Sequence, residues 1–126
     1  VTAQAGDVAP MHCTAAGKLY LAFGPQSLFE TILVSGLPKM TPNTLTTPEK
    51  LRKDLKKIKT QGWSSDNEEM LEGIKAVAVP LLDKAGDIQA CIAIRGPAHR
   101  MTPQRISSWV EELVTYAKEC SRELNI

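Results

Sequence analysis

Two apolar runs separated by a short polar turn dominate the second half of the chain. They span residues 74–82 and 88–94, and the turn at 83–87 contains an aspartate that can open it and a glycine that can take a positive φ. Large and small side chains alternate within each run, as they do in strands whose two faces meet different surroundings. The pattern predicts a β-hairpin with one face that fills a core and one face of small residues.

The small face of the hairpin admits two interpretations. Ala76 belongs to it on the first strand, and Ala93 and Arg95 belong to it on the second. A face of small residues that ends in a guanidinium can form the floor of a pocket. Alternatively, the alanines lie beneath a helix and Arg95 extends into solvent where the strand ends.

The register of the hairpin decides whether these residues share a face. If the two ends of the turn pair with each other, Ala76 falls opposite Ile94 and points away from Arg95. A β-bulge would restore the common face. We place it at Pro80, which has no amide hydrogen to donate to the ladder.

Capping residues and the helical spacing of apolar side chains predict four helices. The predicted ranges are 15–23 after an N-cap at Thr14, 27–34 with a capping box of Ser27 and Glu30, 48–61 after Thr47, and 103–124 after Thr102. The last helix has an apolar stripe that can cover one face of a sheet or form a dimer contact. With an extended piece at 63–65, and with Gly96-Pro97 expected to end the second strand, the fold class is α+β, an antiparallel β-sheet flanked by α-helices.

Composition narrows the class of protein. With 126 residues, 43% of them hydrophobic and 23% charged, the chain is expected to form a single globular domain over 1–126. The 15 basic and 14 acidic residues nearly cancel, so no field of one sign favours nucleic acid or a membrane as the main partner of this piece. No run approaches a membrane span, and three cysteines without disulfide or metal spacing indicate a reducing, cytoplasmic location. Because the chain starts at Val1, we expect a fragment of a longer protein.

The first helix offers a candidate anion site. It opens with Ala15, Ala16 and Gly17, whose small side chains leave the backbone N–H groups of the first turn accessible. Because a helix N-terminus carries a partial positive charge, a carboxylate or phosphate can bind there. The alternative is that these small residues only permit close helix packing.

Two patterns raise the question of metal binding or catalysis. Four acidic side chains fall within residues 66–72, but no histidine lies near them in the sequence, so we predict no metal site and no cofactor. Cys13 follows His12, yet adjacent residues in an extended segment point their side chains apart, and no nucleophile elbow follows. The sequence therefore predicts that the chain is not an enzyme.

Several separated motifs occur in an order that is more specific than any one of them. They are MHCTAAGKLYLAF at 11–23, TPNTLT at 41–46, a glycine and acidic pattern at 62–73, and KAVAVPLLDKAGDIQACIAIRGP at 75–97. From Pro10 to the C-terminus the chain resembles the effector-binding domain of IclR-type bacterial transcriptional regulators.

The resemblance implies a ligand sensor related to the GAF and PAS folds, which encloses a metabolite, usually a small organic acid. In such regulators a winged helix-turn-helix domain precedes the sensor and binds operator DNA, and the sensor domains join subunits into homodimers or homotetramers. Neither that DNA-binding domain nor the opening strands of the sensor are found in this sequence. The chain is therefore expected to be the latter part of the sensor.

The resemblance also implies a ligand site. In relatives that bind small 2-oxo acids, backbone amides at a helix start hold the ligand carboxylate, an acidic residue contacts its polar head, and three side chains, typically Cys, Ser and Ser, complete the pocket. The residues that match these positions are Ala15, Ala16, Asp66, Ala76, Ala93 and Arg95.

This chain departs from that pattern on the hairpin. Methyl groups replace two hydrogen-bonding side chains at Ala76 and Ala93, and a guanidinium replaces a hydroxyl at Arg95. A ligand loses hydroxyl and thiol contacts here and gains a charge-assisted pair. We therefore expect an anionic ligand, a small carboxylate metabolite with a second carboxylate or an apolar body. The alternative is that Arg95 pairs with Asp66 and fills the site, which leaves a module for oligomerisation alone.

Overall fold

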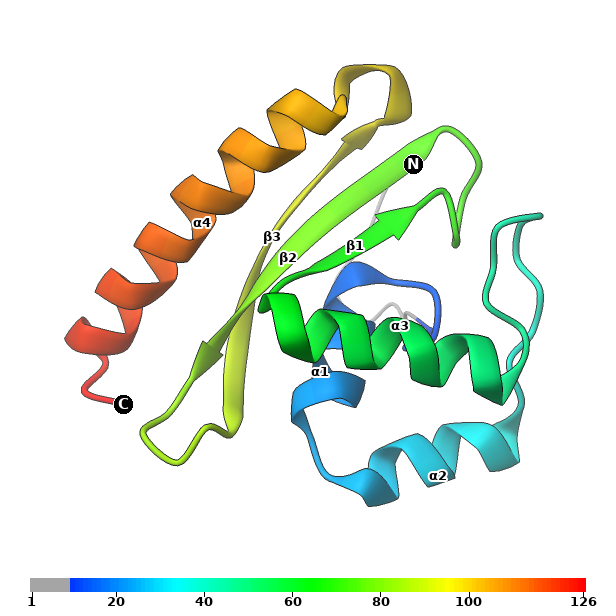
Figure 1. The fold of residues 1–126 in the computed structure, drawn as a ribbon, viewed down its shortest axis with the longest axis horizontal. Coiled ribbons are helices and arrows are strands. Elements are labelled where there is room, and N and C mark those ends of the chain that lie inside the picture. The colour runs from blue at the N-terminus through cyan, green and yellow to red at the C-terminus, as the bar shows by residue number, and fades with distance from the viewer. Residues whose placement is uncertain (1–9) are drawn as a thin grey trace.

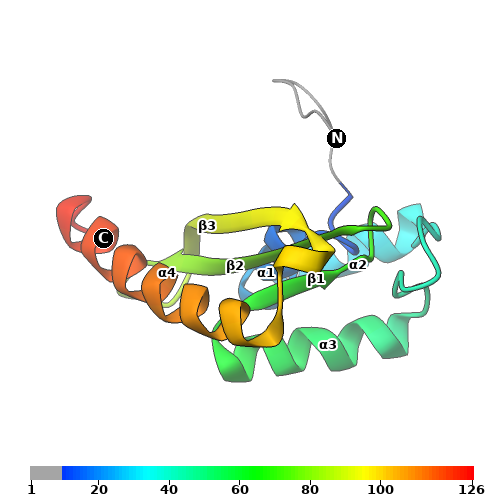
Figure 2. The ribbon, with the colours of Figure 1, turned by 90° about the horizontal axis from the view of Figure 1, so that it is seen from above.

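A three-stranded antiparallel sheet forms the centre of the computed structural model, which describes residues 10–126. The strands are β1 (Ser64–Asn67), β2 (Ile74–Leu82) and β3 (Ile88–Pro97), in the order β1-β2-β3. The helices are α1 (Ala15–Phe23), α2 (Gln26–Ser35), α3 (Pro48–Gln61) and α4 (Pro103–Glu123), with a 3-10 turn, η1, at Ala98–Arg100. One face of the sheet is covered by α4, and α1 to α3 lie on the other side (Figure 1). In Figure 2 the strands follow in the order β3, β2, β1 toward α3. The predicted α+β class is confirmed.

The central strand β2 separates two apolar cores. Its larger side chains, Val77, Val79 and Leu81, pack with the stripe of α4, as the alternating pattern predicts. Its smaller side chains, Ala76 and Ala78, pack with α1 and α3 in the other core. Because alanine leaves more room above the sheet than valine or leucine, helices and a cavity share the second face.

The register of the hairpin confirms one part of the prediction and corrects another. The two ends of the turn pair as expected. Ala76 nevertheless lies opposite Arg95, because a bulge shifts the register by one residue. The bulge falls between Leu81 and Leu82, so its predicted position at Pro80 is wrong. The consequence that mattered for the site still holds, since the small residues of both strands share one face.

Side chains around the turn explain where the bulge lies. Oδ1 of Asp83 accepts hydrogen bonds from the amides of Ala85 and Asp87, and Oδ2 accepts one from the side chain of Gln89, each at 2.9 Å. These bonds hold Gln89, the extra residue of β3, beside the turn. Pro80 needs no bulge: it pairs with Cys91 in the regular register, and β2 has no partner in β1 beyond Ala78.

Threonine caps begin three of the four helices as predicted. The side chains of Thr14, Thr47 and Thr102 each accept a hydrogen bond from the third amide of the helix that follows. The capping box predicted for α2 is wrong. That helix starts at Gln26, because Pro25 already has the extended backbone of an N-cap (φ −68°, ψ 148°) and its carbonyl accepts from the amide of Leu28.

The second strand of the hairpin, β3, also runs further than predicted. Gly96 and Pro97 were expected to end it, but they pair with Lys75 and Ile74 of β2. Among the described residues β3 is an edge strand, where a proline without an amide hydrogen is tolerated. The longer strand places Arg95 within the sheet rather than at its end.

We expect Gly17→Ala to destabilise the fold by about 1–3 kcal/mol, because the first turn of α1 leaves no space for a methyl group. A Cβ on Gly17 would lie 2.5 Å from the Cα of Met11 and 2.6 Å from its carbonyl oxygen. Urea denaturation measures the effect. The matched control is Gly96→Ala, whose Cβ would meet only Met101 Sδ at 3.7 Å and which should stay within about 1 kcal/mol of the wild type. Equal stability of the two variants would contradict the packing described for α1.

Candidate functional site

A cavity of about 370 Å³ lies between the start of α1 and the small face of the sheet. It brings together all six residues proposed for the ligand site, which come from α1, β1, β2 and β3. Thr14 and Gly17, which the sequence analysis placed at the start of the first helix, also line it, and the walls that the sequence did not suggest come from Met11, Tyr20 and Met70. Most of this lining is apolar, and the polar groups are concentrated at a few points.

The start of α1 presents two free amides to this cavity. Thr14 closes the first turn, since its hydroxyl accepts from the amide of Gly17 (3.1 Å) and donates to the carbonyl of Pro10 (2.7 Å). Within residues 10–126, no hydrogen bond uses the amides of Ala15 or Ala16. These two donors lie at the positive end of the helix, so they are free to bind an anion.

Asp66 supplies a buried carboxylate to the same cavity. The residue is only 5% exposed, and its Oδ1 accepts a hydrogen bond from the amide of Glu69 (2.7 Å). No hydrogen bond in the described part of the chain uses Oδ2. Burial raises the pKa of Asp66 above its ordinary value. The free oxygen can accept a hydrogen bond from a hydroxyl or an amine of a ligand.

Three residues form a straight row across the sheet beneath the cavity. Asp66 pairs with Ala76, and Ala76 pairs with Arg95. The Arg95 side chain is exposed, yet it lines the cavity and its charge acts to lower the pKa of Asp66. The two ion pairs found among residues 10–126 both belong to Lys18, so Arg95 and Asp66 do not pair directly. The sequence left two interpretations of Arg95 open, as part of a pocket floor or as a side chain extended into solvent. Each agrees with part of the structure, because Arg95 borders a cavity and is also exposed.

A buried charge network behind the cavity was missed by the sequence analysis. Lys18 of α1 is 1% exposed, and its Nζ lies 2.8 Å from Asp54 Oδ2 of α3 and 2.8 and 3.1 Å from the two carboxylate oxygens of Glu69. Glu69 in turn accepts from the amide of Asn67 (2.9 Å) and donates its own amide to Asp66. The network thus fixes the turn that carries Asp66.

Residues 41–44 bind the turn that follows Asp66 through two further hydrogen bonds. The hydroxyls of Thr41 and Thr44 donate to the carbonyls of Glu68 and Glu69, both at 2.6 Å. Glu68 has a positive φ of 55°, a conformation that a residue with a side chain adopts only when its surroundings impose it. The threonine hydroxyls therefore help to hold a strained turn beside the site.

We expect Asp66→Asn to gain stability relative to the wild type as pH rises. The pKa of Asp66 is higher in the folded protein than in the unfolded chain. Ionisation of Asp66 therefore destabilises the folded wild type, and this loss of stability develops as pH rises through the folded pKa. Asparagine keeps the acceptor for the Glu69 amide and carries no charge. Melting temperatures at about pH 3 and about pH 7 should show the variant gaining between the two. An unchanged difference at both pH values would contradict the burial of this carboxylate.

The residues that suggested catalysis are not arranged for it. Burial, together with the charges of Asp66 and Glu69, raises the pKa of Cys13 to about 11, so this thiol stays protonated near neutral pH. His12 turns away, with its Nε2 2.8 Å from the carbonyl oxygen of Pro38. Over residues 10–126 no group of three potential metal ligands is found. In the same part of the chain, no helix combines the length and apolar character of a membrane span.

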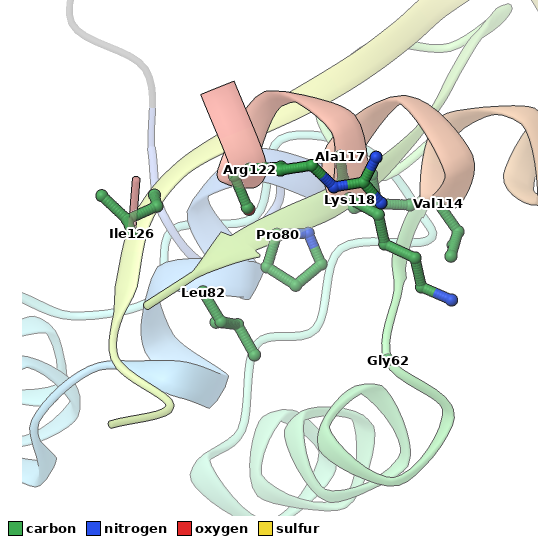
Figure 3. A pocket seen from close by; sticks show the side chains of 10 residues that line it. Gly62, Pro80, Leu82, Val114, Ala117, Lys118, Arg122 and Ile126 are labelled. Atoms are coloured by element: carbon green, nitrogen blue, oxygen red, sulfur yellow. The ribbon is translucent and has the colours of Figure 1, made fainter. Parts of the chain in front are cut away.

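A larger cavity, of about 480 Å³, lies elsewhere. Figure 3 shows it where the last turns of α4 pass over the end of β2. Its floor includes Pro80, Leu82 and Ala117, and its charged groups are Lys118 and Arg122, which are both exposed. None of its polar side chains is buried. The smaller cavity, with a buried carboxylate and two free amides, is therefore the better candidate site.

Comparison with known proteins identifies the family. Residues 1–122 match the model of the C-terminal region of the bacterial transcriptional regulator IclR. The chain is 34% identical over 125 residues to the HTH-type transcriptional repressor AllR of Escherichia coli, which covers 98% of this chain and 46% of AllR. The chain thus spans less than half the length of this relative. The relatives are named as regulators rather than enzymes, which agrees with the prediction that the chain is not an enzyme.

Solved structures support the same assignment. The IclR protein of Thermotoga maritima superposes with a TM-score of 0.90 at 36% identity, over 100% of this chain and 51% of that protein. A double mutant of the inducer-binding domain of PobR from Acinetobacter, solved in complex with 3-hydroxybenzoic acid, superposes with a TM-score of 0.81 at 28% identity, over 89% of this chain and 65% of that domain. The chain therefore belongs to the IclR family of bacterial transcriptional regulators and corresponds to their C-terminal effector-binding domain, with its GAF/PAS-like α+β fold.

Proposed function

We propose that this domain senses a small organic acid, and that binding of the acid in the intact protein changes the affinity of a winged helix-turn-helix domain for operator DNA. The domain is proposed to be one unit over residues 1–126, to act in the bacterial cytoplasm and to assemble as a homodimer or homotetramer. A ligand can act in this way only if it binds one conformation of the regulator better than another.

One observation carries the proposal: a buried carboxylate faces two free helix amides across a cavity. The amides of Ala15 and Ala16 suit the carboxylate of the ligand, and Oδ2 of Asp66 suits a hydroxyl or hydrated carbonyl nearby. The PobR neighbour, a double mutant, is a complex with 3-hydroxybenzoic acid, a molecule with one carboxylate and one hydroxyl. That chemistry agrees with the two kinds of polar group in this cavity.

A thermal-shift screen of hydroxy and oxo acids on the intact protein tests the proposal. We expect at least one acid to stabilise the wild type, and Asp66→Ala to abolish most of that stabilisation. The control is Asp87→Ala, which removes an exposed carboxylate in the hairpin turn and should leave binding unchanged. The hit is then added to the intact regulator on operator DNA, where it should change the apparent Kd. If no acid shifts the melting temperature, the sensing function is contradicted.

The alternative is an oligomerisation module without a working pocket. Light scattering of the intact protein with and without the acids from the screen separates the two functions. Association that forms without any bound acid, together with a negative screen, would favour the alternative. Binding of an acid at Asp66 would support the sensor, whether the protein associates only with the acid or also without it.

A further inference from the structure

We propose that the ligand carries a second anionic group, held by Arg95, and is therefore a short-chain hydroxy- or oxo-dicarboxylate. This inference rests on the proposed function and names the class of acid that the same site takes. Arg95 is then the residue that selects dicarboxylates over monocarboxylates.

The row across the sheet sets the geometry. Asp66, Ala76 and Arg95 lie opposite one another on three adjacent strands. Neighbouring strands are about 4.8 Å apart, so the backbones of Asp66 and Arg95 are separated by about 10 Å. In the sheet, Ala76 with its small side chain is the one residue between them in this row. A short carbon chain can lie on the methyl group of Ala76 with its ends near the two charged side chains.

The neighbouring positions keep this space open. Ala78 shares the face of Ala76 because the two lie two residues apart on β2, and Ala93, which pairs with Ala78, shares it because of the bulge near the turn. A longer side chain at Ala93 would project into the cavity that it lines. Met11 and Met70 also line the cavity and supply apolar walls for the carbon chain of a ligand. The cavity therefore combines apolar walls with a few polar groups.

The Arg95 guanidinium is a cationic group of this cavity that can take a second carboxylate. Across residues 10–126 the Arg95 guanidinium donates no hydrogen bond and forms no ion pair, although guanidinium groups bind carboxylates through two parallel hydrogen bonds. One ligand carboxylate at the Ala15 and Ala16 amides leaves Arg95 without a partner. A second carboxylate fills that position while a hydroxyl reaches Asp66. Because Arg95 is exposed, solvent screens its interaction with the second carboxylate. We therefore expect this interaction to strengthen binding by an amount near the lower end of the range for charged hydrogen bonds.

Matched acids test this inference by isothermal titration of the intact protein. One pair is 2-hydroxysuccinate and 2-hydroxybutyrate, and the other is 2-oxoglutarate and 2-oxopentanoate, so each pair differs in the second carboxylate. We expect a dicarboxylate to bind about tenfold more tightly than its partner. Arg95→Ala should weaken the dicarboxylate about tenfold and change the monocarboxylate less than twofold.

The outcomes separate this inference from the function on which it rests. Equal binding of both members of each pair to the wild type, or equal weakening of both by Arg95→Ala, would overturn the role of Arg95 and leave the sensor intact. Failure of all four acids, while another monocarboxylate from the screen binds through Asp66, would overturn only the dicarboxylate class. Circular dichroism of Arg95→Ala checks that the fold is kept, which we expect because the side chain is exposed.

Discussion

Replacing Lys18 by methionine should lower the free energy of unfolding by about 3–5 kcal/mol, the largest effect that we expect of any single substitution. The side chains of Lys18 and Glu69 are only 2% and 8% exposed. Methionine removes the cation and leaves the buried Glu69 carboxylate without a positive charge beside it, with only the Asn67 amide still donating to it. Asp54 is affected less because its side chain is 28% exposed and can be hydrated. Urea denaturation followed by circular dichroism measures the loss.

Two further variants make this prediction sharp. Lys53→Met removes an exposed lysine of α3 and should change stability by less than about 0.5 kcal/mol. The double variant Lys18→Met/Glu69→Gln also removes the buried charge of Glu69. It should recover part of the stability that Lys18→Met loses. A Lys18→Met protein as stable as the wild type would show that the charge network does not support the turn of Asp66.

Replacing Ala15 by proline should weaken binding of a small carboxylate by about 10- to 100-fold while the fold is retained. Proline removes one of the two free amides of α1 and puts a ring carbon in its place. The backbone tolerates the change, because Thr14 already has the extended conformation that precedes a proline (φ −116°, ψ 148°). The chain itself uses the same arrangement at Thr47-Pro48 and Thr102-Pro103. Titration with the acid found in the screen measures the effect.

The control for Ala15→Pro is Ala15→Gly, which keeps the amide hydrogen. It should bind the acid as the wild type does, even if α1 loses up to about 1 kcal/mol of helical stability. If both variants bind equally well, the amide of Ala15 does not hold the ligand.

Local signals in the sequence were sufficient to predict most elements. The helix boundaries depend on residues close to them in the sequence. These are the Thr-Pro pairs before α3 and α4, the threonine before α1 and the glycines after α1 and α3. Alternation of large and small side chains in β2 likewise predicted its two faces. The capping box failed because Pro25, one position before the helix, already provided the required backbone.

Features that depend on distant contacts could not be predicted in the same way. Lys18 occurs in an ordinary amphipathic helix, and its partners Asp54 and Glu69 are 36 and 51 residues away. The bulge depends on how the side chain of Asp83 binds both the turn and Gln89. By contrast, the cluster of Ala15, Asp66 and the hairpin residues was anticipated through the family resemblance, since local chemistry alone does not bring α1 and β1 together.

Amide resonances offer the most direct test of the site. In a titration of the ¹⁵N-labelled intact protein with the acid found in the screen, followed by ¹H–¹⁵N NMR, we expect the largest shifts at the amides of Ala15 and Ala16. Smaller shifts should appear along β1 near Asp66. Unchanged Ala15 and Ala16 resonances under saturating acid, with the main shifts around Lys118 and Arg122, would contradict the account and place the ligand in the cavity beside the end of α4.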